Sequence, residues 1–198
     1  MSRFPEVSFM LSAAAGPQFP ADHGVEIAFA GRSNAGKSSA INVITARHGL
    51  ARTSKTPGRT RLLNFFELAP LKRLVDLPGY GYANVPEVER RAWLPLIDAL
   101  RTRASLKGLF VIVDSRRGLT PADEGLLEWA LPRHRVHVLL SKADKLNRGE
   151  AAAVLRAGAP MLSGRATAQL FSALKGTGVV QAQDTLEAWL ACAGGEGP

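Results

Sequence analysis

Cysteine and long apolar runs are the two features that this chain of 198 residues has least of. Its single cysteine, Cys192, excludes an internal disulfide, which agrees with a reducing compartment. We interpret Cys192 itself as a small apolar residue near the end of the last helix. No apolar run approaches the length that crosses a membrane. Residues 1–6 lack the charged-then-apolar order of a signal peptide. We therefore expect a cytoplasmic protein with no membrane partner.

Acidic residues are also in deficit, with 17 Asp and Glu against 25 Lys and Arg. The net charge of +8 indicates a polyanionic partner such as RNA, or a basic surface that only keeps the protein soluble. With 46% hydrophobic residues, the chain can form one domain with a sizeable core. We expect a lead-in over residues 1–24, one domain over 25–191, and a flexible tail over 192–198.

The run 31–38 matches the phosphate-loop pattern G-x-x-x-x-G-K-[ST] at every fixed position. Apolar residues on either side favour a buried strand before the run and a helix after it. Gly31 and Gly36 let the backbone bend, so that successive N–H groups point at phosphate oxygens. Lys37 can reach the outer phosphates, and the Ser38 hydroxyl can bind magnesium. From the motif alone, a chance glycine-rich turn is the alternative.

Strand-like and helix-like stretches alternate along the rest of the chain. The alternation predicts an α/β fold: a single domain with a mostly parallel six-stranded sheet, one antiparallel strand, and helices on both faces. Residues 4–11 can add a short edge strand or a packed arm, and Pro95 should kink or restart its helix. The predicted strands are 25–30, 61–68, 72–76, 109–114, 136–140 and 166–171, and the predicted helices are 37–47, 86–104, 121–131, 147–157 and 178–191.

Three further motifs follow strands, at the carboxyl edge of the sheet where α/β proteins bind ligands. Asp76 can hold magnesium through a water, and the Gly79 amide can approach a terminal phosphate. Asp144 can accept from the ring N–H and amino group of guanine, a donor pair that adenine lacks, while the stem of Lys142 lies along the base. Backbone amides after Phe171 can meet the guanine carbonyl. Each motif alone is weak, because ordinary strand-ending turns contain the same residues.

The order of the motifs is more specific than any one of them. A phosphate loop, a threonine-bearing loop, D-x-x-G, K-x-D and a Ser-Ala pair occur in this order along the chain, which is the arrangement of a GTPase. Together they resemble the EngB (YihA/YsxC) family of bacterial GTP-binding proteins over residues 18–191. The stretches that carry the resemblance are Gly31–Ser39, Thr56–Thr60 (T-P-G-R-T), Asp76–Tyr82 (D-L-P-G-Y-G-Y), Lys142–Asp144 and Phe171–Ser172.

The resemblance implies a TRAFAC-class P-loop NTPase, Ras-like in fold, that assists assembly of the large ribosomal subunit, with a link to division septum formation. It implies GTP or GDP as ligand, magnesium held by Ser38 and Thr60, ribosomal RNA as partner, and a monomer. The implied catalytic residues are Lys37, Asn34, Thr60 and Gly79. The implied nucleotide-binding residues are Gly31, Arg32, Ser33, Asn34, Ala35, Gly36, Lys37, Ser38, Gly58, Arg59, Thr60, Arg61, Leu62, Asp76, Leu77, Pro78, Gly79, Ser141, Lys142, Ala143, Asp144, Phe171, Ser172 and Ala173.

Two positions depart from the general GTPase pattern. Ser141 stands where Asn is usual, which predicts fewer local hydrogen bonds and a less rigid base loop. Tyr80 stands where Ras-like enzymes have the Gln that orients the attacking water, so we expect slow intrinsic hydrolysis.

Three interpretations stay open at this point. Asn34 either coordinates a potassium ion that replaces an arginine finger, as in related GTPases, or only tolerates an unusual backbone angle. The basic loop 49–60 either grips ribosomal RNA when GTP orders it or is simply a solvated charged loop. The chain as a whole could also be another P-loop NTPase, or a nucleotide-binding module with little hydrolysis.

Overall fold

The computed structural model describes residues 2–51, 62–79, 95–130, 133–162, 164 and 166–191. The strands in this part of the chain are β1 (Ser8–Ala13), β2 (Val25–Gly31), β3 (Leu63–Ala69), β4 (Lys72–Asp76), β5 (Leu106–Asp114), β6 (Arg135–Ser141) and β7 (Thr167–Leu170). They form one seven-stranded sheet in the order β1-β3-β4-β2-β5-β6-β7. β3 runs antiparallel to its neighbours β1 and β4, and the remaining neighbours pair in parallel.

The predicted α/β fold with a mostly parallel sheet is confirmed, but the predicted number of six strands is wrong. The additional strand is β1 in the predicted lead-in, where residues 4–11 were expected to form either an edge strand or a packed arm, and it pairs with β3. Ser12 stands opposite Asn64, and its hydroxyl donates to the Asn64 side-chain oxygen at 2.7 Å. Only Ala13 of β1 is buried, so the strand lies mostly exposed at the edge of the sheet.

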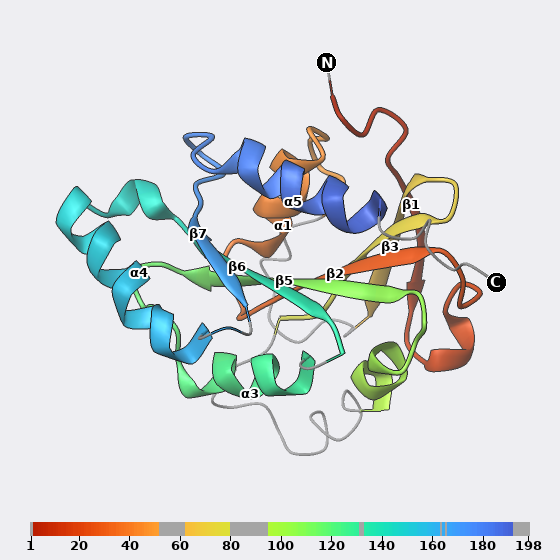
Figure 1. Cartoon of the computed structure of the whole chain (residues 1–198). Coiled ribbons are helices and arrows are strands. Elements are labelled where there is room, and N and C mark those ends of the chain that lie inside the picture. The colour runs from red at the N-terminus through yellow and green to blue at the C-terminus, as the bar shows by residue number, and fades with distance from the viewer. Residues whose placement is uncertain are drawn as a thin grey trace.

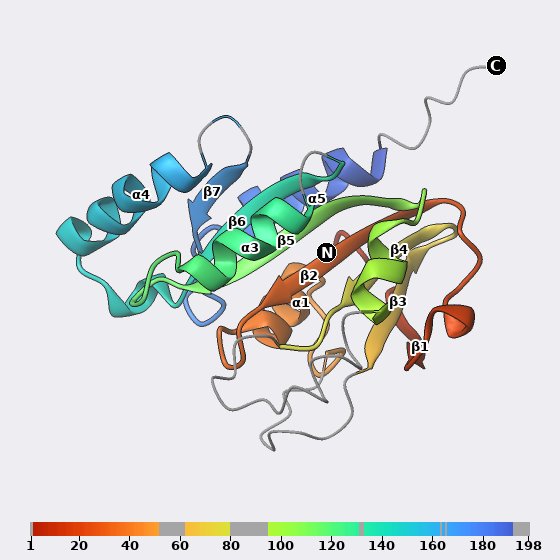
Figure 2. The ribbon, with the colours of Figure 1, turned by 90° about the horizontal axis from the view of Figure 1, so that it is seen from below.

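Helices cover both faces of the sheet in two layers (Figures 1 and 2). They are α1 (Lys37–Ile44), a helical segment over 95–101, α3 (Pro121–Ala130), α4 (Arg148–Leu162) and α5 (Val179–Ala191), with short 3₁₀ turns η1 (Gly16–Gln18) and η2 (Ala143–Lys145). α1 and α5 pack on one face around Phe29, Phe110 and Trp189. The segment 95–101, α3 and α4 pack on the other face around Val111. None of the helices described is both long enough and apolar enough to cross a membrane.

Most predicted element bounds agree with the structure to within a few residues. The largest difference in a described element is α4, which continues through Pro160 to Leu162 rather than ending at residue 157. Leu162 is buried in the core, and this packing carries the helix past the proline. Residues 80–94 lie outside the described part, and Pro95 is the first described residue of the helical segment 95–101. The kink or restart at Pro95 therefore stays a prediction.

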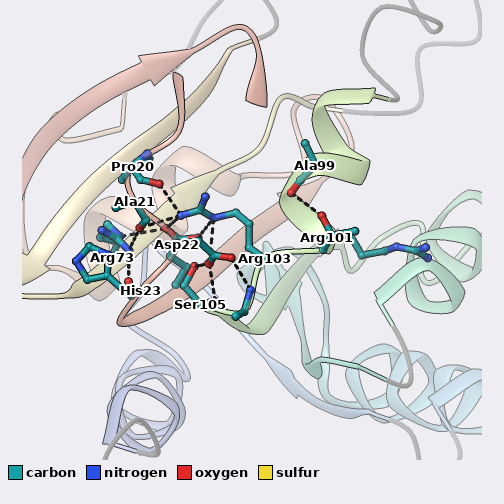
Figure 3. Close-up of polar contacts among 12 residues, drawn as sticks. Pro20, Ala21, Asp22, His23, Arg73, Ala99, Arg101, Arg103 and Ser105 are labelled. Atoms are coloured by element: carbon teal, nitrogen blue, oxygen red, sulfur yellow. Dashed lines mark hydrogen bonds and ion pairs between the residues drawn. The ribbon is translucent and has the colours of Figure 1, made fainter. Parts of the chain in front are cut away.

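A buried ion cluster lies at the amino-terminal end of the central strand β2 (Figure 3). Glu26 is fully buried, and Arg103 donates to both of its oxygens, at 2.7 and 2.8 Å. The Arg73 Nε lies 3.0 Å from the same carboxylate. Asp22 accepts the backbone N–H and the hydroxyl of Ser105. The cluster ties β4 to the chain that leads into β2 and β5, and removing one partner of such a buried group costs about 3–5 kcal/mol.

Candidate nucleotide-binding site

The phosphate-loop motif forms a tight turn between β2 and α1. Gly31 ends β2, where an added Cβ would stand 2.7 Å from the Ile112 carbonyl oxygen. Asn34 and Gly36 have φ angles of 62° and 104°, both in the left-handed region. Gly36 then caps α1, which begins at Lys37. Residues 25–44 therefore form a strand–loop–helix unit in which the N-terminus of the helix can bind phosphate.

The D-x-x-G segment lies directly against this loop. Asp76 ends β4 and forms an ion pair with Lys37, and the two side chains are 7% and 12% exposed. A Cβ added to Gly79 would stand 3.1 Å from the Cα of Ser33. The parallel pairing of β4 with β2 brings the two motifs together, since both follow the carboxyl ends of neighbouring strands.

The first base loop, Ser141–Asp144, is bonded to the phosphate loop. The Ser141 hydroxyl lies 2.5 Å from the Ala35 carbonyl oxygen, and the Lys142 ammonium donates to the Asn34 carbonyl oxygen at 2.7 Å. Lys142 has a φ of 58°, so the chain turns sharply where β6 ends. A sharp turn directs the polar groups of the loop toward the phosphate loop.

The two base loops are also bonded to each other. The Ser172 hydroxyl donates to Asp144 Oδ1 at 2.6 Å, and the Ala143 N–H donates to the Phe171 carbonyl oxygen at 3.1 Å. The bond from Ser172 is the main cause that lowers the pKa of Asp144 below its ordinary value. Asp144 is therefore held as a carboxylate, which only accepts hydrogen bonds.

The structure brings the described candidate residues together along one edge of the sheet. Residues 31–38, 76–79, 141–144 and 171–173 lie at or after the carboxyl ends of β2, β4, β6 and β7. Leu62 is half-buried just before β3. The predicted sites Gly58, Arg59, Thr60 and Arg61 lie outside the described residues.

Comparison with known proteins finds a matching family model and close relatives in sequence. A family model described as "50S ribosome-binding GTPase" matches residues 26–142. A relative from Azoarcus sp. (strain BH72), named "Probable GTP-binding protein EngB", is 50% identical over 203 residues, which span 100% of this chain and 97% of the relative. One of the same name from Coxiella burnetii (strain RSA 493 / Nine Mile phase I) is 48% identical over 191 residues, 94% of this chain and 93% of its own length. The chain belongs to the EngB family of GTP-binding proteins.

Solved structures agree with this assignment at the level of fold. The crystal structure of a probable GTP-binding protein engB has a TM-score of 0.68 at 23% identity, covering 84% of this chain and 99% of that one. Era in complex with MgGDPNP and nucleotides 1506–1542 of 16S ribosomal RNA has a TM-score of 0.63 at 21% identity, covering 84% of this chain and 57% of Era. The EngB-family chain therefore has the fold of a GTPase domain.

Members of GTPase families typically bind magnesium with their nucleotide, and the residues present fit this metal. The Asp76 carboxylate and the hydroxyl of Ser38 supply the hard oxygen donors that magnesium prefers. The described residues contain no group of three or more His, Cys, Asp or Glu side chains that could hold a metal. One or two protein oxygens plus substrate phosphates is the usual magnesium environment.

Sequence reasoning missed Asp114 and Asn42, both of which contact the loops of the site. Asp114 ends β5 and accepts from Lys142 at 2.8 Å. Asn42 of α1 exchanges two hydrogen bonds with the backbone of Ala51, at 2.7 and 3.0 Å, where the basic loop begins. The one available signal was that Asp114, like Asp76, is a carboxylate at the end of a predicted strand.

Proposed function

We propose that this EngB-family protein is a slow cytoplasmic GTPase whose nucleotide state controls its association with the large ribosomal subunit during assembly. The match to a family of 50S ribosome-binding GTPases supports the partner, and the net charge of +8 supports contact with RNA. The family resemblance extends the proposal to septum formation in cell division. The proposed unit is a monomer with a domain over 25–191 and a tail over 192–198, while the lead-in adds β1 to the sheet.

The main support for GTP binding is that four segments, each following a strand, meet at one place and contact one another there. Gly79 lies against the phosphate loop, both base loops are bonded to their neighbours, and Asp144 is held ionised beside Ser172. An ionised carboxylate at this place can accept the two donors of guanine. The amide of Gly79 would contact the terminal phosphate, and the backbone of Ser172 and Ala173 would meet the guanine carbonyl.

In the phosphate loop, Lys37 would leave Asp76 and bind the phosphates of GTP instead. Its ammonium is paired with Asp76, and the outer phosphates of GTP offer a larger negative charge at the same N-terminus of α1. Ser38 and Thr60 would hold magnesium, with Asp76 behind them, and the metal would neutralise charge on the phosphates. Lys37 would then stabilise the negative charge that develops as the terminal phosphoryl group is transferred. Phosphoryl transfer depends on positioning and charge stabilisation more than on covalent chemistry.

Hydrolysis is expected to be slow because Tyr80 stands at the position of the water-orienting Gln. Asn34 is exposed on the phosphate loop, where its side chain could coordinate potassium. Its φ of 62° equally suits the interpretation that Asn34 is there for the backbone alone, since Asn tolerates this conformation. We propose the potassium role, and a substitution that keeps the backbone angle separates the two.

Co-sedimentation with purified large ribosomal subunits tests the proposal. Binding should be stronger with a GTP analogue than with GDP or no nucleotide, and should fall steeply with salt if several Lys and Arg contact phosphates. The Asp144→Asn variant is the matched control, because a xanthosine triphosphate analogue should restore its binding where the GTP analogue does not. If binding to the subunit depended on neither the salt concentration nor the nucleotide, the partner would be a different one.

The two alternatives give different results in simpler assays. Another P-loop NTPase would bind ATP as well as GTP in a direct titration. A binding module with little hydrolysis would show no turnover either with or without ribosomal subunits.

A further inference from the structure

Asp114 lies at the carboxyl end of β5, between the strands that lead into the phosphate loop and the first base loop. Its Oδ1 accepts from the Arg116 backbone N–H at 3.1 Å and from Arg116 Nε at 2.9 Å. Its Oδ2 accepts from Arg116 Nη2 at 2.6 Å and from the Lys142 ammonium at 2.8 Å. The buried carboxylate thus holds one cation on each side, and Arg116 above all keeps the pKa of Asp114 well below its usual range.

Lys142 is fixed from two directions. Its ammonium donates to Asp114 and to the Asn34 carbonyl oxygen, at 2.8 and 2.7 Å, and its backbone has a φ of 58°. The side chain therefore spans from the base loop to the phosphate loop. A free lysine side chain has many rotamers, and a ligand that must order it loses affinity.

We propose that Asp114 is a positioning residue for recognition of the base: it holds Lys142 in place before the nucleotide arrives, so that the lysine stem lies along the guanine ring. The proposal rests on the proposed function, which places guanine between the two base loops. It adds that affinity for the base depends on a carboxylate outside the GTPase motifs, one that touches no part of the nucleotide.

A purely structural role for Asp114 would act through Arg116 and the turn after β5. This turn is also closed by backbone bonds, because Arg117 and Gly118 donate to the Asp114 carbonyl oxygen at 2.9 and 3.2 Å. The Asp114 side chain is therefore not the only group that holds the turn. Its contacts to Lys142 and to Arg116 can be removed separately.

Three variants separate the two roles. Asp114→Asn removes the charge that holds Lys142 and should weaken GTP, GDP and inosine triphosphate alike by about three- to tenfold, because the lysine stem contacts the face of the base and not its edge. Arg116→Lys keeps a positive charge but breaks the two-bond fork, and should bind all three nucleotides within about twofold of wild type. Lys142→Met keeps the stem without the ammonium and should reproduce the loss seen in Asp114→Asn.

Isothermal titration of the full chain provides the readout, with inorganic tripolyphosphate as a probe that has no base. Asp114→Asn should bind tripolyphosphate like wild type, which also shows that the phosphate loop is folded. The double variant Asp114→Asn/Lys142→Met should lose no more affinity than Lys142→Met alone. Additive losses, a loss that differs between GTP and inosine triphosphate, or the same loss in Arg116→Lys would each overturn the proposal.

The Asp144→Asn variant distinguishes failure of this inference from failure of the proposed function. If that variant keeps its preference for GTP over xanthosine triphosphate, the placement of guanine is wrong and both proposals fail. If it switches preference while Asp114→Asn binds every nucleotide like wild type, only the role of Asp114 is refuted.

Discussion

The hydroxyl of Ser141 lies 2.5 Å from the carbonyl oxygen of Ala35 and joins the end of β6 to the phosphate loop. It also lies 3.0 Å from the Val113 carbonyl oxygen, so one small side chain reaches the main chain of two other segments. A hydroxyl has a single proton and donates to one of these oxygens at a time. Whether the base loop is less rigid than it would be with Asn stays a prediction, but this serine does connect it to the loop that follows β2.

Replacing Ser141 tests this connection. Ser141→Ala leaves the buried Ala35 carbonyl without this donor, so we expect a loss of about 1 kcal/mol in the free energy of unfolding and weaker GTP binding. Urea unfolding of the nucleotide-free protein and a GTP titration measure the two effects. Ser39→Ala, at an exposed position of α1, is the matched control and should change neither. Wild-type values in Ser141→Ala would show that the bond contributes nothing.

Lys37→Ala should sharply weaken binding of GTP and GDP. The substitution also leaves the buried Asp76 carboxylate unpaired, which would cost about 3–5 kcal/mol of stability. The double variant Lys37→Ala/Asp76→Asn removes that charge and should recover stability without recovering nucleotide binding. Near-normal GTP affinity in either folded variant, measured by titration, would refute the phosphate-loop assignment.

A variant that keeps the backbone conformation at residue 34 tests whether hydrolysis depends on potassium. Hydrolysis should be faster in potassium than in sodium at equal ionic strength. Asn34→Gly removes the side chain yet accepts the φ of 62°, which Ala would not adopt readily, and it should abolish the difference between the two salts. Equal wild-type rates in both salts would leave Asn34 as a backbone residue only.

Asp144→Asn should exchange guanine for xanthine as the preferred base. Two charge-assisted bonds are lost with GTP, so affinity should fall on the order of a hundredfold or more. Xanthine carries a carbonyl where guanine has its amine, and the new amide can donate to it. Competition among GTP, ATP and xanthosine triphosphate on both proteins measures the switch. An unchanged preference would remove the main physical support for guanine specificity.

Acid should remove a contribution of Asp22 to stability. Burial alone would raise the pKa of Asp22, but hydrogen bonds from Ser105 and Ala104 lower it from 3.8 to about 2. A depressed folded-state pKa stabilises the protein above the unfolded value, and this stability is lost as pH falls from about 4 to about 2. Wild type should therefore be more stable than Asp22→Asn at neutral pH, with the difference shrinking over that range. Asp184→Asn, at an exposed ion pair, should differ little from wild type at any pH.

The apolar runs and the motif spacing predicted most of the sheet and the strand-ending segments that meet at the site. β4 was predicted as residues 72–76, as observed, because it is a short run closed by a carboxylate. The extent of α4 was not predictable, since burial of Leu162 and not local propensity extends the helix past Pro160. Asp114 belongs to no motif, and only folding shows that its neighbour across the sheet is the end of β6.

The pairing of β1 with β3 has a consequence for how the chain is made and trimmed. β1 is synthesised first but has no partner until residue 69 has emerged, so the N-terminal segment must wait for a strand that lies more than fifty positions later. β1 is the edge strand of the sheet, and a product that had lost residues 8–13 would make β3 the edge strand instead, with more buried side chains than β1 has. An apolar edge strand pairs more readily with another chain than a mostly exposed one does, so we expect N-terminal proteolysis to promote aggregation.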